Sequence, residues 1–276
     1  MSIQWYPGHM NKARREMIDA MPVTDVIVEV LDARLPYSSE NPMIAEIGKG
    51  KPCLKILNKA DLADPAITTL WAQSLKKRPG TTAVALSAKQ PEAKRLIPKL
   101  CRQLVPHRGT LIKPLRIMIA GIPNVGKSTL INLLVGKRAA KVADEAAVTK
   151  MQQQYEIEKG VLINDTPGIT WPKFETEAGG YRLAATGAIG KNAMDFHEVA
   201  TFLAEYLLQH YPDLVRARYQ LSALPGQGFE LLEEIARRRG CLLAGGDIDT
   251  DKVANAFLVD FRGGKIGRIS LEKPEE

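Results

Sequence analysis

An apolar run, a glycine-rich loop and the start of a helix follow one another in residues 115–134, LRIMIAGIPNVGKSTLINLL. The loop, Gly121-Ile-Pro-Asn-Val-Gly-Lys-Ser128, has the spacing of a phosphate-binding loop and the required order of strand, loop and helix. Its glycines let backbone N–H groups wrap phosphates at the positive end of a helix dipole. Such a match arises by chance in a chain of this length on the order of once in a hundred. We therefore predict a nucleotide-phosphate site here, in preference to a simple Gly-rich turn.

Side chains of this loop have separate expected roles. Lys127 is expected to reach the β- and γ-phosphates as a catalytic group, and the Ser128 hydroxyl to bind Mg²⁺. The residues of this segment that we expect to contact nucleotide are Gly121, Asn124, Val125, Gly126, Lys127, Ser128 and Thr129.

Length and composition describe an ordinary globular chain. It has 276 residues, 45% hydrophobic and 25% charged, which suggests about two domains. No stretch approaches the roughly 18 uncharged apolar residues of a membrane span, and the first residues lack the apolar run of a signal peptide. Cys53, Cys101 and Cys241 have neither the number of a paired framework nor metal-ligand spacing. We expect a soluble cytoplasmic protein.

The net charge of +7 is unevenly distributed. Residues 171–276 carry 13 Lys and Arg against 16 Asp and Glu, so the excess of positive charge lies before them. The stretch Lys89–Arg116 has eight basic residues and one acid. Such a field favours polyanions such as nucleic acid, but a solvated helix face explains it equally well.

Hydrophobic periodicity predicts alternating strands and helices in the first part of the chain. The expected strands are Val26–Leu31, Cys53–Leu57, Thr82–Leu86, Leu115–Ala120 and Val161–Ile163, with an alternating edge strand at Gln153–Ile157. The expected helices are Asn41–Gly48, Asp64–Lys77, Glu92–Leu104 and Lys127–Leu134. Uninterrupted apolar strands that alternate with helices indicate an α/β fold, a mostly parallel sheet with helices on both faces.

After Trp171-Pro172 the pattern becomes mostly helical. The expected helices are Asp195–His210, Leu214–Tyr219, Glu230–Arg239 and Asp251–Phe261, with Gly240 and Gly263-Gly264 as helix stops. We therefore expect an α/β domain over residues 1–175 and a helical C-terminal domain over residues 176–276.

Asp165-Thr-Pro-Gly168 follows the last predicted strand of the sheet. Alone the pattern is weak, since an Asp-x-x-Gly pair occurs about once by chance in such a chain. Beside a phosphate loop it has a role. Asp165 would hold Mg²⁺ through a water, and the Gly168 amide would donate to a γ-phosphate.

Asn58-Lys59-Ala60-Asp61 ends the strand that begins at Cys53. A carboxylate can accept from both the N1–H and the exocyclic amine of guanine, and adenine lacks that arrangement, so Asp61 would select the base. Asn58 would lie on the purine edge and the Lys59 stem over the ring.

Ser87-Ala88-Lys89 ends the next strand and would supply a backbone N–H to the guanine O6. By itself this tripeptide fits any loop, and its place one strand after the Asn58 motif makes the role credible.

These four motifs resemble those of the translation-factor class of GTPases, but in a different order, since the base-recognition motifs precede the phosphate loop. That order implies a circularly permuted P-loop GTPase domain, in which Lys89–Lys113 bridges the former chain ends. The permutation is physically allowed because the loops meet at the ends of adjacent strands.

Further segments extend the resemblance over essentially the whole chain, to the bacterial ribosome biogenesis GTPase A family. They are Trp5–Met10, Leu31–Pro36, Trp171–Phe174 and Gly240–Leu242. The resemblance implies hydrolysis of GTP to GDP, a role in late assembly of the large ribosomal subunit, and contact of the helical C-terminal domain with rRNA. The GTP state would control attachment to the pre-ribosomal particle, and we expect a monomer off the ribosome.

Two departures from the family pattern bear on these expectations. Thr149, a switch residue that would bind Mg²⁺, follows Ala146-Ala147-Val148 where the family has Pro-Gly. The acidic C-terminal part requires that any RNA contact there come from a local face such as Arg237–Arg239. A cluster favourable to the helix dipole explains that triplet equally well.

Hydrolysis needs a group that orients water. Ile169 occupies the position near which small GTPases carry a glutamine, and it cannot hydrogen-bond water. The resemblance points to His9 as the catalytic group, whereas a surface position in a helix-leading turn is the alternative. Asn124 matches the K⁺ ligand of potassium-activated GTPases.

Two functions of other classes compete with this one. A metabolic phosphotransferase is disfavoured because Asn58–Asp61 specifies guanine and no acceptor-binding motif stands out. A GTP-binding regulatory module that acts on another partner, without RNA, stays open.

Overall fold

The computed structural model describes residues 9–136, 154–165, 176–189 and 195–274, and the side chains of these residues except those of residues 9–13 and 165. Its chain forms two compact units that divide between Pro172 and Lys173. We call the first the sheet unit and the second the helical unit. The residues from Glu272 onward belong again to the sheet unit, so the chain returns to it after the helical unit ends at Leu271.

Six strands of the described residues form one sheet in the sheet unit, in the order β3-β2-β1-β4-β6-β5. They are β1 (Val26–Asp32), β2 (Cys53–Asn58), β3 (Thr81–Ala85), β4 (Leu115–Ala120), β5 (Gln154–Glu158) and β6 (Val161–Asp165). All neighbours are parallel except β5, which runs antiparallel to β6 at the edge. The predicted mostly parallel sheet and its antiparallel edge strand are confirmed.

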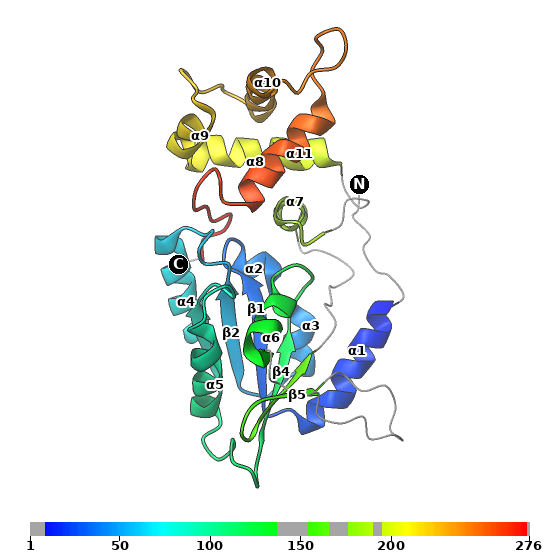
Figure 1. Cartoon of the computed structure of the whole chain (residues 1–276), viewed down its shortest axis with the longest axis vertical. Helices are drawn as coiled ribbons and strands as arrows, with labels where there is room; N and C mark the ends of the chain where they lie inside the picture. The colour runs from blue at the N-terminus through cyan, green and yellow to red at the C-terminus, as the bar shows by residue number, and fades with distance from the viewer. Residues whose placement is uncertain (1–8, 137–153, 166–175, 190–194, 275–276) are drawn as a thin grey trace. The chain divides into compact units, whose positions relative to one another are not determined.

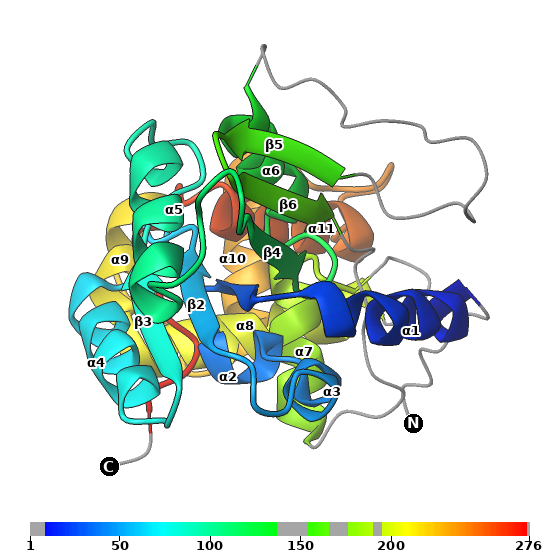
Figure 2. The ribbon, with the colours of Figure 1, turned by 90° about the horizontal axis from the view of Figure 1, so that it is seen from below.

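Helices cover both faces of this sheet (Figures 1 and 2). Those of the unit are α1 (His9–Ala20), a 3₁₀ turn η1 (Met21–Val23), α2 (Pro36–Ser39), α3 (Pro42–Ile47), α4 (Pro65–Lys76), α5 (Ala93–Leu104) and α6 (Lys127–Val135). Ile27 packs with α1 and α3, and Leu31 with α4. Ile27 and Leu31 are four residues apart on one strand and share a face, so these three helices cover that face. Helices α5 and α6 contact each other on the opposite face.

Local sequence explains where these helices begin. The Asp64 carboxylate accepts from the N–H groups of Ala66 (2.9 Å) and Ile67 (3.2 Å), and Pro65 occupies the first helical position of α4. The Asn41 side chain caps α3 in the same way, by accepting from Met43 N at 3.0 Å. Such caps satisfy N–H groups that lack a partner within the helix.

The helical unit is built around α8, which contacts the four other helices described there (Figure 1). Its elements are α7 (Glu177–Thr186), α8 (Phe196–His210), α9 (Pro212–Tyr219), α10 (Gly228–Arg239) and α11 (Thr250–Arg262). Leu203, Leu207, Leu232 and Phe257 are among its fully or almost fully buried side chains. Gly240 ends α10 with φ +64°. The four helices expected after Trp171 are present, and this part is helical as predicted.

Helices α1, α2 and α7 were not predicted. Helix α7 contains Gly179-Gly180, which lowers helix propensity, but the Thr176 hydroxyl caps it by accepting from Gly179 N at 3.1 Å. Helix α1 carries a highly charged sequence, and its apolar Met17 is buried in a cluster with Ile27 and Ile44. Tertiary packing therefore stabilises what periodicity did not reveal. Among the helices described, none is long and apolar enough for a bilayer crossing.

Candidate nucleotide-binding site

The phosphate loop connects β4 to α6 and needs glycine at both ends. Gly121 has φ +146°, and a Cβ built on it would lie 2.5 Å from the Val30 carbonyl oxygen. Gly126 has φ +101°, and a Cβ there would lie 2.3 Å from Asn58 Nδ2. Because real side chains do not tolerate such approaches, only glycine keeps the loop this close to β1 and β2.

The first turn of α6 presents the reactive side chains of the loop. Lys127 is buried, and its Nζ donates to the Ile122 carbonyl at 3.3 Å across the loop. Ser128 and Thr129 are exposed. Asn124 is exposed too, with a left-handed backbone (φ +60°). Gly126 caps this helix, so the positive end of its dipole faces the loop.

Asn58 at the end of β2 connects three loops. Its Nδ2 donates to the Val125 carbonyl at 2.7 Å, and its Oδ1 accepts from Ala88 N at 2.8 Å. One buried amide therefore holds the phosphate loop and the Ser87–Lys89 loop against the strand end. The Ala88 N–H is used in this bond. The Lys89 N–H has a longer bond of 3.4 Å to Ser87 Oγ, and it is the freer donor of the two.

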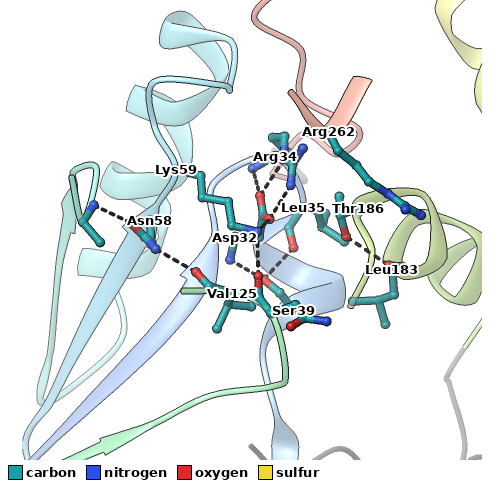
Figure 3. Close-up of polar contacts among 12 residues, drawn as sticks. Asp32, Arg34, Leu35, Ser39, Asn58, Lys59, Val125, Leu183, Thr186 and Arg262 are labelled. Atoms are coloured by element: carbon teal, nitrogen blue, oxygen red, sulfur yellow. Dashed lines mark hydrogen bonds and ion pairs between the residues drawn. The ribbon is translucent and has the colours of Figure 1, made fainter. Parts of the chain in front are cut away.

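Lys59 makes a second bridge to the phosphate loop. Its Nζ donates to the Asn124 carbonyl at 2.7 Å and lies 2.9 Å from Oδ2 of Asp32 (Figure 3). Its backbone, like that of Asn124, is left-handed with φ +60°. The neighbouring Ala60 N–H donates to the Leu86 carbonyl at 3.2 Å. Asp61 follows with an exposed side chain.

Asp32 ends β1 and pairs with Arg34 as well as Lys59 (Figure 3). Arg34 Nε donates to Oδ1 at 2.9 Å and its Nη2 to Oδ2 at 2.7 Å. Burial alone would raise the pKa of Asp32. The charges of Arg34 and Lys59 outweigh that effect, so its pKa lies well below the usual range and the carboxylate stays ionised.

The structure thus brings together several of the residues that the sequence singled out. Asn58, Lys59, Ala88, Asn124, Val125 and Gly126 contact one another at one edge of the sheet. Because parallel strands end at the same edge, motifs far apart in the chain meet there. The sequence indicates Asp32 and Arg34 only through the family resemblance of Leu31–Pro36. A charged pair directly after a fully buried strand is the signal that would have singled them out.

Several predicted residues lie at or beyond the limits of the description. Thr149, Gly168, Ile169 and Trp171–Phe174 lie outside the described residues. His9 is described only as the first residue of α1, and Asp165 only as the last residue of β6, where its backbone pairs with Ile119 of β4.

The Arg237–Arg239 triplet has partners within the helical unit. Arg239 Nη2 lies 2.5 Å from Oδ2 of the buried Asp260, and Arg237 Nη2 lies 3.0 Å from Oε2 of Glu233. Arg238 donates to the Gln220 carbonyl at 3.0 Å. These contacts stabilise the end of α10, which favours the structural interpretation of the triplet.

The basic stretch before the phosphate loop lies partly on α5. Lys94, Arg95 and Lys99 are exposed there, while Ile97 and Cys101 form the buried side of the helix. The α5 part of the stretch is therefore a solvated helix face, and it also leaves positive charge available to a polyanion.

All three cysteines are free thiols. Burial raises the pKa of the Cys53 and Cys101 thiols to about 12, so both are protonated and unreactive at neutral pH.

A model of the family described as "50S ribosome-binding GTPase" matches residues 116–206. The ribosome biogenesis GTPase A of Bacillus cereus is 44% identical over all of this chain and 95% of its own length. That of Thermotoga maritima is 31% identical over 99% of this chain and 95% of its own length.

Among solved structures, GNP-bound YlqF from T. maritima is 27% identical, with a TM-score of 0.67, over 96% of this chain and 99% of its own. A GDP-bound YlqF structure gives 26% identity and a TM-score of 0.68. The fold, the interlocked loops and these full-length relatives agree, and the chain belongs to the ribosome biogenesis GTPase A family.

Proposed function

We propose that this chain is a GTP-hydrolysing assembly factor for the large ribosomal subunit, and that its GTP state controls attachment to the pre-ribosomal particle. The observation that supports nucleotide binding is the pair of hydrogen bonds between the base-recognition loop and the phosphate loop. Asn58 donates to the Val125 carbonyl, and Lys59 donates to the Asn124 carbonyl. The ribosomal half is supported by the names of the full-length relatives and by the description of the matching family model.

Guanine would be read at the edge where these loops meet. The exposed Asp61 carboxylate accepts from N1–H and the exocyclic amine, and the Lys59 stem covers one face of the ring. The backbone N–H of Lys89 is the donor we assign to O6, since the Ala88 N–H is engaged by Asn58. Asn58, Ala60 and Ser87 hold these loops in place.

The phosphates would lie in the loop 121–129, where backbone N–H groups and Lys127 offset their charge. Mg²⁺ prefers oxygen donors, and two of the expected donors come from the helix that follows β4 and from the end of the neighbouring strand β6. Ser128 is exposed in the first turn of α6, and Asp165 ends β6 beside Ile119 of β4, two residues before Gly121. These oxygen-bearing side chains have the chemistry that the ion prefers. Thr149 would be a further ligand, and the Gly168 amide would donate to the γ-phosphate. When bound, the ion neutralises charge on the phosphates.

A monovalent cation at Asn124 belongs to the same proposal. The Asn124 side chain is exposed and its carbonyl is held by Lys59, so the residue is fixed at the mouth of the phosphate loop. K⁺ there would supply the positive charge that an arginine finger otherwise provides.

The attacking water would be oriented by His9, because Ile169 offers no hydrogen bond. An imidazole that begins α1 can orient or deprotonate water when it reaches the γ-phosphate. Until a partner positions it, basal hydrolysis should be slow.

RNA contact by the helical unit would use a local face, since residues 171–276 carry more acids than bases and Arg237–Arg239 already have partners. The exposed lysine and arginine side chains of α5 offer a second positive face. We expect action in the cytoplasm, where ribosomal particles are assembled, and a monomer off the ribosome.

Co-sedimentation with large ribosomal subunits tests this function. We expect the protein to pellet with the subunits in a non-hydrolysable GTP analogue and to stay in the supernatant in GDP, and GTP turnover to rise when subunits are added. Nucleotide binding without any dependence on subunits would favour the alternative, a GTP-binding regulatory module that acts on another partner without RNA.

A further inference from the structure

Asp32 lies between the two loops of the nucleotide site without belonging to either. It ends β1, the strand between β2 and β4 in the sheet. Its backbone pairs with that of Asn58, and the next N–H, of Ala33, donates to the Asn58 carbonyl at 2.8 Å. The Asp32 N–H in turn donates to Ser39 Oγ at 3.0 Å. The residue is therefore fixed to both β2 and α2, and it is 2% exposed.

Both carboxylate oxygens of Asp32 accept from Arg34, and one of them also accepts from Lys59. Oδ1 accepts from the backbone N–H of Arg34 (3.1 Å) and from its Nε (2.9 Å). Oδ2 accepts from Arg34 Nη2 (2.7 Å) and from Lys59 Nζ (2.9 Å). Arg34 fixes the plane of the carboxylate, and that plane fixes where the Lys59 ammonium lies.

The Lys59 ammonium is the link that depends on this carboxylate. Lys59 and Asn124 both have left-handed backbones, a conformation that costs a non-glycine residue about 1–2 kcal/mol. One hydrogen bond, from Lys59 Nζ to the Asn124 carbonyl, connects these two strained positions. A flexible lysine holds such a bond poorly unless a second partner restrains its end.

We propose that Asp32 is a positioning residue of the nucleotide site: held by Arg34, it fixes Lys59 across the phosphate loop and so sets the spacing between the loops for base and phosphates. It touches no nucleotide itself. The inference rests on the proposed GTP-binding function and adds to it a residue outside the four motifs.

Substitution of Asp32 by Asn isolates the effect. The side chain keeps its shape, but one oxygen becomes an amide donor, so Arg34 and Lys59 can no longer both be satisfied. We expect the affinity for GDP and for a GTP analogue to fall by about tenfold or more, the scale of one charge-assisted hydrogen bond. The affinities for the two nucleotides should fall by the same factor, because both bind between the same loops. The KM for GTP should rise while kcat at saturation is kept.

The decisive measurement is a double-mutant cycle in the full-length protein. Dissociation of a fluorescent GDP is measured by stopped flow for the wild type, Asp32→Asn, Lys59→Met and the double variant. If Asp32 acts through Lys59, the Asp32→Asn substitution accelerates GDP dissociation when Lys59 is present. In the Lys59→Met background it causes little further acceleration. Independent, multiplicative effects of the two substitutions would overturn the proposal, as would a fall in kcat with KM unchanged.

The same strand supplies a matched control. Glu29 of β1, three residues from Asp32, is a buried carboxylate that accepts from Lys55 of β2 and from the Asn41 N–H rather than from Lys59. Glu29→Gln should lower thermal stability while nucleotide dissociation stays as in the wild type. Equal acceleration by Glu29→Gln and Asp32→Asn would reduce Asp32 to a structural residue and overturn the proposal.

If Asp32→Asn does not fold, Arg34→Lys carries the test. It keeps a positive charge but loses the two-pronged grip on the carboxylate, so nucleotide dissociation should be accelerated less than in Lys59→Met, and unchanged dissociation contradicts the proposal. The affinity of the wild type for guanine nucleotides distinguishes failure of this inference from failure of the function on which it rests. A wild type without affinity for guanine nucleotides would overturn both. If the wild type binds GDP and a well-folded Asp32→Asn variant binds it equally tightly, the positioning role alone is overturned.

Discussion

The Ser38 N–H donates to the Glu272 carboxylate at 3.1 Å, although 234 positions separate the two residues in the chain. The Ser38 hydroxyl also donates to that carboxylate, and Trp71 Nε1 donates to the Glu272 carbonyl at 3.1 Å. Glu272 is 5% exposed. The chain thus returns from the helical unit to the start of α2, close in sequence to Asp32 and Arg34.

Glu272→Ala should destabilise the sheet unit. It leaves the buried Ser38 N–H and hydroxyl without their acceptor, which typically costs about 1–3 kcal/mol and lowers Tm by several degrees. Thermal unfolding followed by tryptophan fluorescence checks this, because Trp71 contacts the same residue. Lys273→Ala is the control, since Lys273 is exposed. An equal Tm for both variants would mean that the returning segment contributes nothing.

Asp61→Asn should shift base preference from guanine toward xanthine. The amide presents a donor where the xanthine edge has an oxygen in place of the guanine amine. Competition between GDP and XDP measures the shift. Asp64→Asn is a close control, because asparagine still caps α4 and leaves the base edge untouched. The wild type should bind GTP and GDP but not ATP, and tight ATP binding would contradict guanine selection.

Hydrolysis should be faster in K⁺ than in Na⁺ at equal ionic strength, and Asn124→Ala should abolish the difference. The physical reason is a cation held beside the phosphates, where it offsets developing charge. Steady-state phosphate release in the two salts is the measurement. Equal rates in the wild type would remove the cation from the mechanism and leave guanine binding intact.

His9→Ala should lower subunit-stimulated turnover at least tenfold while GTP affinity is kept. A group that orients water acts mainly in the transition state, and such groups contribute about 10²–10⁴-fold. Turnover across a subunit titration separates this from a docking role. A lower plateau supports catalysis, whereas an unchanged plateau with a shifted midpoint assigns His9 to docking.

Acid should loosen the helical unit through Asp260. Burial would raise the pKa of this carboxyl, but hydrogen bonds and charges from Arg218 and Arg239 lower it below its usual value. A carboxyl whose pKa is lowered by folding stabilises the folded state at pH values above its pKa in the unfolded chain, about 3.9. That stability is lost as the pH falls through the pKa of the folded state. Asp260→Asn should remove this part of the pH dependence. Hydrogen exchange of α11 between pH 7 and pH 3 measures it, and identical profiles for wild type and variant would exclude the role.

Local sequence determined the sheet, the phosphate loop and the order of the motifs. Strands such as Leu115–Ala120, which is apolar except for Arg116, are mostly apolar because a parallel sheet is covered on both faces, and that burial can be read from the sequence. The glycines of the loop and the side chains of Asn58–Asp61 have types and spacing that the chemistry of phosphates and guanine requires. Their meeting at one sheet edge follows from parallel strand direction, whatever their order in the chain.

Tertiary structure alone decided which distant polar and charged groups pair with each other. Asp32 with Lys59, Ser38 with Glu272, and Arg239 with Asp260 are pairs whose members are separated along the chain, and no local pattern indicates their partners. Helix α1 likewise owes its place to the packing of Met17 with Ile27 and Ile44, not to a clear apolar period. Buried charges and irregular helices are selected by what the folded chain brings beside them, because desolvation and packing act on spatial neighbours rather than on sequence neighbours.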